Sequence, residues 1–105
     1  MKNEQIIQKT IDFVKNSLAD IESGHAWDHI YRVWKLSKHI AKKEKVNIFV
    51  VELAALLHDI ADSKFHEGDE EIGPKLAGNF LNKLNVDSET VDHVIKIIDN
   101  ISFRK

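Results

Sequence analysis

Apolar residues recur along this chain with the spacing of amphipathic helices. Near the N-terminus they lie close to the i, i+3, i+4 and i+7 positions that share one helical face. These apolar residues are Ile6, Ile7, Ile11, Phe13, Val14 and Leu18. The pattern predicts a helix from about Asn3 to Asp20, which Ser23 and Gly24 then interrupt.

Two further helical patterns follow between residues 27 and 61. The first ends in the charged stretch 42–45 and carries Trp27, Ile30, Val33, Trp34, Leu36 and Ile40. Asn47 has a side chain suited to a helix N-cap and predicts another helix that runs to about Ala61. That helix is apolar on more than one side, which is typical of a helix at the centre of a fold.

The rest of the chain predicts two more helices after a polar loop at residues 62–73. Pro74 suits a first helical turn, where its missing N–H needs no partner. Asp87 or Ser88 can cap the last helix. The apolar residues are Leu76, Phe80, Leu81 and Leu84 in one helix and Val91, Val94, Ile95 and Ile98 in the other. With no alternating strand pattern, the sequence predicts one all-α domain of about five helices over residues 1–105.

Composition narrows the class of protein. The 105 residues are 43% hydrophobic and 30% charged, as in ordinary globular domains. The net charge of -2 argues against binding of polymeric nucleic acid, which usually shows as a basic excess. The absence of cysteine excludes disulfides and thiolate chemistry. No apolar run reaches the roughly 18 residues of a membrane span, so we expect a cytoplasmic protein that does not bind membranes.

Two clusters of ionisable residues carry the candidate chemistry. His29 lies within a predicted helix, and His58 and Asp59 directly follow the nearly unbroken apolar run 50–57. Ionisable groups are normally excluded from such positions, and a divalent cation would offset their burial by binding the imidazole and the carboxylate. Two packed helices can bring all three residues to one point. Asp28 or a backbone carbonyl could orient an imidazole.

The sequences around these residues resemble the HD superfamily of metal-dependent phosphohydrolases. The similar segments are HAWDHIYRV at residues 25–33, ELAALLHDIADSK at residues 52–64 and IIDNISF at residues 97–103. They are most similar to a small bacterial branch of nucleotide pyrophosphohydrolase-like proteins. The resemblance covers nearly the whole chain and implies a single HD-type helical bundle.

The resemblance also implies a metal site. The family's first three ligands correspond to His29, His58 and Asp59, which would hold one divalent ion of manganese, magnesium, nickel, cobalt, iron or zinc. The family's fourth ligand is an aspartate on a later helix, and no aspartate of this chain matches it. The chain therefore resembles the N-terminal half of the family domain, and we expect it to be truncated at the C-terminus.

The implied reaction is hydrolysis of a small-molecule phosphate ester or anhydride, with a nucleotide as the expected substrate, by a metal-activated water. Asp62, one helical turn past His58, is the candidate for moving the proton. Arg32 and Lys64 could bind the phosphate, although both could equally be solvated surface charges. His25 lies four residues before His29 and could line the site or cap the helix.

Two other classes of protein stay open. The chain could be a regulatory HD module that binds metal and nucleotide without turnover, because the fourth ligand has no match. It could also be a structural helical bundle or inactive fragment whose histidine–aspartate cluster has lost its role. Metal content separates the structural bundle from the other two, and turnover separates the enzyme from the regulatory module.

A shortened helical bundle would expose apolar surface that further helices normally cover. Large exposed apolar patches on soluble proteins are usually paired with another surface. We therefore expect this chain to form a homodimer in solution. Size-exclusion chromatography with light scattering measures this directly, and a clean monomer at high protein concentration would contradict the prediction.

Overall fold

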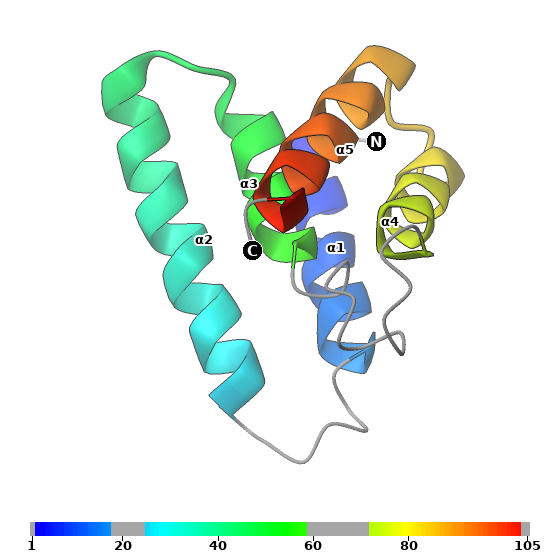
Figure 1. Cartoon of the computed structure of the whole chain (residues 1–105), viewed down its shortest axis with the longest axis horizontal. Helices are drawn as coiled ribbons and strands as arrows, with labels where there is room; N and C mark the ends of the chain where they lie inside the picture. The colour runs from blue at the N-terminus through cyan, green and yellow to red at the C-terminus, as the bar shows by residue number, and fades with distance from the viewer. Residues whose placement is uncertain (1, 18–24, 59–71, 104–105) are drawn as a thin grey trace.

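The computed structural model describes residues 2–17, 25–58 and 72–103, and these residues form five α-helices and no strand. The helices are α1 (Asn3–Ser17), α2 (His25–Glu44), α3 (Ile48–Leu57), α4 (Ile72–Lys83) and α5 (Ser88–Phe103) (Figure 1). The predicted all-α fold is confirmed. None of the helices in this described part combines the length and the apolar character that a membrane span requires.

Helices α3 and α5 begin directly after polar residues that the sequence predicts as N-caps. The Asn47 side chain accepts a hydrogen bond from the Val50 N–H at 3.2 Å, and α3 begins at the next residue. Asp87 caps α5 in the same way, accepting from the Thr90 N–H at 3.1 Å. Each carboxylate or amide oxygen thus binds an N–H that has no partner within the helix.

Helix α4 begins earlier than the sequence pattern predicts. The predicted loop at 62–73 is wrong at its end, because α4 already begins at Ile72. Pro74 still lies in the first turn, where a residue without an N–H breaks no helical hydrogen bond. The predicted ends at Asp20 and Ala61 lie outside the described residues.

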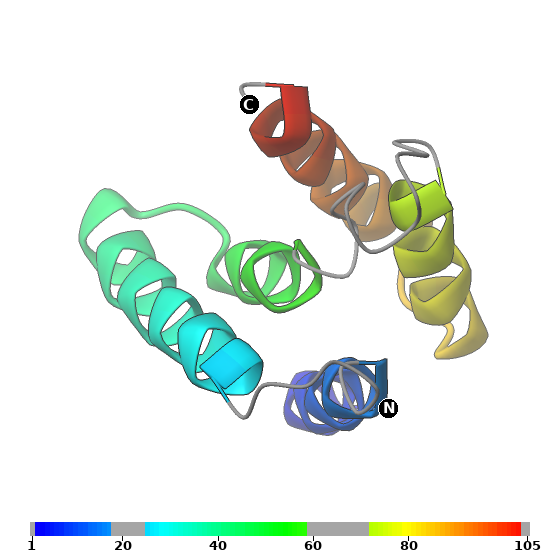
Figure 2. The same cartoon turned by 60° about the horizontal axis from the view of Figure 1, so that its bottom comes forward.

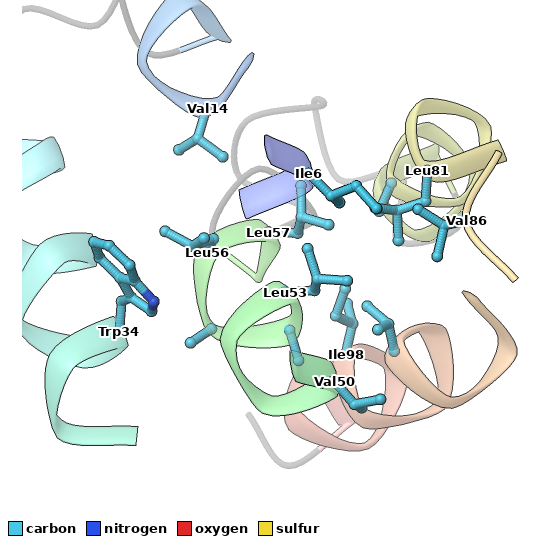
Figure 3. Close-up of a cluster of buried hydrophobic side chains, with 14 of the residues drawn as sticks. Ile6, Val14, Trp34, Val50, Leu53, Leu56, Leu57, Leu81, Val86 and Ile98 are labelled. Atoms are coloured by element: carbon cyan, nitrogen blue, oxygen red, sulfur yellow. The ribbon is translucent and has the colours of Figure 1, made fainter. Parts of the chain in front are cut away.

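Helix α3 lies at the centre of the fold. It packs against α1, α2 and α5, and α4 packs against α5 (Figure 2). Figure 3 shows Leu53, Leu56 and Leu57 of α3 among side chains from the other four helices. All three leucines are fully buried. The unusually apolar sequence of α3 is explained by this position, because a helix surrounded by others has little polar surface to present.

A buried hydrogen bond joins α2 to α3. The Trp34 indole Nε1 donates to a carboxylate oxygen of Glu52 at 3.1 Å, and each of these residues is only 9% exposed. Glu52 is the one buried charged residue of the described core. Since a buried carboxylate without partners is strongly unfavourable, this bond fixes where α2 lies on α3.

We expect Glu52→Ala to lower the free energy of unfolding by about 1–3 kcal/mol, because it leaves the buried Trp34 N–H without an acceptor. Glu52→Gln, which keeps an acceptor oxygen, should be milder. Urea denaturation of each variant measures the change. The control is Glu44→Ala at the exposed end of α2, where we expect a change within about 0.5 kcal/mol. Equal effects of the Glu44 and Glu52 alanine variants would contradict a specific role for this bond.

Candidate metal centre

His58 lies at the end of α3, at the boundary between the core and the surface. Leu57 before it is fully buried, whereas His58 is partly exposed. Its backbone N–H closes the helix on the Ala54 carbonyl at 3.0 Å. Because α3 is buried almost to its last residue, the histidine that follows it lies at the edge of the core. There its ring can face both protein and solvent.

The ring of His58 is held by a backbone carbonyl. Its Nδ1 lies 2.6 Å from the carbonyl oxygen of Ala55, in the last turn of α3. Carbonyls in a last helical turn lack intrahelical donors, and a carbonyl can only accept, so Nδ1 carries the hydrogen. In the neutral imidazole this leaves the lone pair on Nε2. A metal-binding histidine is typically oriented in this way through its second nitrogen.

The ring of His29 lies close to that of His58. The two centroids are 6.3 Å apart and the ring planes make an angle of 58°. His29 comes from the first half of α2, and α2 and α3 run in opposite directions along each other after the short connection at residues 45–47 (Figure 1). This hairpin brings the start of α2 beside the end of α3.

The donor set of the site fits a divalent ion. Imidazole nitrogens bind such ions at about 2 Å, as in zinc sites, and the structure brings two imidazole rings to 6.3 Å between their centroids. Within residues 2–17, 25–58 and 72–103, no group of three or more potential ligands gathers at one point. The predicted third ligand, Asp59, lies outside the described residues.

The structure describes only some of the other predicted site residues. Arg32 is exposed on α2, three residues past His29 and therefore about one turn further along the same helix. His25 is the first residue of α2, but its side chain is not among those described. Asp62 and Lys64 lie outside the described residues. Their predicted roles stay predictions.

An open cavity of about 260 Å³ adjoins His58. Its lining is almost entirely apolar and comes from three helices: Val33 and Ser37 of α2; Val51, Ala54, Ala55 and His58 of α3; and Ile97 of α5. The sequence analysis missed this cavity. Val33 and Ser37 lie four and eight residues past His29, so helical spacing alone could have placed them beside it. The contact between the Ala55 carbonyl and the His58 ring could not be predicted from the sequence, because a backbone carbonyl is present at every position.

Comparison with known proteins shows which family this chain is similar to. The family model for the HD domain matches residues 26–100. The uncharacterized protein YpgQ of Bacillus subtilis is 36% identical over 104 residues, which cover 99% of this chain and 50% of YpgQ. The crystal structure of an HD-superfamily hydrolase from Bacillus thuringiensis has 42% sequence identity and a TM-score of 0.85, with 97% of this chain and 53% of that one covered.

The chain thus spans about half the length of the relatives that it matches. The family match begins in the first turn of α2 and includes His29, and it also includes α3 and His58. The resemblance found in the sequence is confirmed at the level of the family. This chain belongs to the HD domain family.

Proposed function

We propose that this chain forms the metal-binding part of a phosphohydrolase that cleaves a small-molecule phosphate ester or anhydride, with a nucleotide as the substrate. The observation that carries the proposal is the pairing of His29 and His58 at the surface end of a buried helix, with the His58 ring oriented by the Ala55 carbonyl. Membership of the HD family and the similarity to an HD-superfamily hydrolase support it.

His29 and His58, together with Asp59, would hold one divalent ion. When bound, such an ion polarises a phosphoryl oxygen and lowers the pKa of a water molecule. Imidazole ligands suit zinc, iron and nickel, whereas a carboxylate also suits magnesium and manganese. A ligand set of imidazoles and a carboxylate is therefore compatible with all six metals considered. The identity of the metal has to be measured.

The remaining chemistry falls to residues near the pair. Arg32 would bind a phosphate through its planar guanidinium, since it is exposed about one helical turn from His29. Lys64 would add a second positive charge, His25 would line the substrate site, and Asp62 would accept the proton of the attacking water. The apolar cavity beside His58 offers space for a non-phosphate part of the substrate.

The alternative is a regulatory HD module that binds metal and nucleotide without hydrolysis. It stays open because the resemblance gives the family a fourth metal ligand, an aspartate, that none of the aspartates of this chain matches. A chain of this kind would share the histidine pair but lack turnover.

Metal content tests the site itself. We expect near-stoichiometric divalent metal in protein purified without chelators or metal-affinity columns, and none in the double variant His58→Ala, Asp59→Ala. The matched controls are His39→Ala on α2 and His93→Ala on α5, because both histidines are exposed and neither belongs to the predicted ligand set. Elemental analysis gives the answer. Absence of metal from the parent, even after soaking with manganese or nickel, would remove the basis of the proposal.

Turnover tests the enzyme against the regulatory module. We expect the metal-loaded chain to release phosphate or pyrophosphate from one or more members of a nucleotide panel. Asp62→Asn should lower kcat about 10²- to 10⁴-fold, as loss of a general base does, while the metal content stays unchanged. A metal-loaded chain that binds nucleotides in calorimetry but hydrolyses none of them would instead support the regulatory module.

A further inference from the structure

A second open cavity lies near the start of α3, away from the histidine pair. Its volume is about 350 Å³, and it shares no lining residue with the cavity beside His58. It lies where α1 and α2 both pack against α3, and Figure 2 shows α3 between these two helices. The lining includes Glu4 and Ile7 of α1, Trp34 and Lys38 of α2, and Phe49 and Glu52 of α3.

One carboxylate oxygen of Glu52 faces this cavity. The other oxygen accepts the Trp34 indole N–H, which is the only hydrogen bond that this side chain makes among the described residues. No buried side-chain oxygen of the described part of the chain lacks a partner. The second oxygen is therefore not buried, and because Glu52 lines the cavity, that oxygen is reached from it.

The charge of Glu52 is poorly compensated. The residue is only 9% exposed, and its one donor is a neutral indole. Within the described residues, no lysine, arginine or histidine nitrogen lies within 4.0 Å of its carboxylate, although Lys38 lines the same cavity. A carboxylate that has lost most of its water is unfavourable without further donors or an opposite charge. A cation that enters the cavity would provide both.

The walls of the cavity favour an organic cation over a metal ion. Ile7, Trp34 and Phe49 offer apolar surface, and a cavity of about 350 Å³ has the size of a small-molecule site. Magnesium and calcium ions need several oxygen ligands and gain nothing from such walls. An alkylammonium donates to the carboxylate through its head and removes its hydrocarbon stem from water.

We propose that the cavity between α1, α2 and α3 binds a small aliphatic amine. Its ammonium group donates to the second oxygen of Glu52, and its stem lies on Trp34 and Phe49. A diamine brings its other ammonium group toward Glu4, which is exposed at the mouth of the cavity. This site is separate from the histidine pair, since Glu52 precedes His58 by six residues, or about 9 Å along a helix.

The experiment is a titration of the full chain followed by nuclear magnetic resonance, with cadaverine, pentylamine and pentanol as probes. The Trp34 indole N–H is the reporter, because it is bonded to Glu52. The Trp27 indole is the internal reference, since Trp27 lies two helical turns earlier on α2 and does not line the cavity. We expect a saturable shift of the Trp34 signal and about tenfold or more tighter binding of cadaverine than of pentanol.

Glu52→Gln separates the charge from the fold. The amide keeps an oxygen that accepts the Trp34 N–H but removes the negative charge, so the affinity for both amines should fall about tenfold or more while that for pentanol stays the same. The matched control is Glu44→Gln at the exposed end of α2, which should bind like the parent. A retained Trp34 signal and an unchanged circular dichroism spectrum show that each variant is folded.

Lys38→Gln tests the sign of the electrostatic effect. It removes a positive charge from the lining and should tighten amine binding, whereas Lys43→Gln, at an exposed position of the same helix, should not.

Three results would each overturn the proposal. The first is equal affinity for pentanol and cadaverine, which means an apolar cavity only. The second is the same saturable shift with sodium or magnesium chloride, and the third is a Glu52→Gln variant that binds amines like the parent. Metal content is measured on the same samples, so failure of the amine site and failure of the metal site are distinguishable.

Discussion

Burial of α3 is the constraint on which the rest of the structure depends. Seven of its ten residues are buried, and it presents apolar surface in several directions at once. No single neighbour can cover such a helix, so α1, α2 and α5 must each pack against it. The removal of Leu53, Leu56 and Leu57 from water contributes a large share of the driving force for folding.

The same constraint explains why the polar groups of α3 are so closely tied to particular partners. Glu52 is buried on the side of α2 and accepts the indole N–H of Trp34, whereas His58 ends the helix and donates to Ala55. Within the described part of the chain, no buried side-chain nitrogen or oxygen lacks a partner. A polar group in a low-dielectric core is tolerated only on that condition. The candidate metal site therefore begins where the buried helix stops.

Much of the fold could be predicted from local patterns. Helical periodicity, the caps Asn47 and Asp87 and the breaks between segments depend on near neighbours in the sequence, so they can be seen without a structure. The start of α4 could not, because the residues before Pro74 carry no strong helix signal. The cavity beside His58 was also missed, since Val33, Ala55 and Ile97 are far apart along the chain and meet only through the arrangement of three helices. His58 was singled out because it directly follows the apolar run 50–57, and His29 because its spacing to the histidine–aspartate pair resembles that of the family.

The connection between α2 and α3 has a consequence for the order of assembly. It consists of residues 45–47, and Lys45 adopts a φ of 56° to reverse the chain. Short closures lose little chain entropy, and contacts between neighbouring helices form early in folding. His29 and His58 belong to this helical hairpin alone, so they can meet before α4 and α5 have docked. An ion captured at that stage would act as a cross-link within a nascent hairpin, and it would favour the antiparallel register of α2 and α3 over other pairings of the helices.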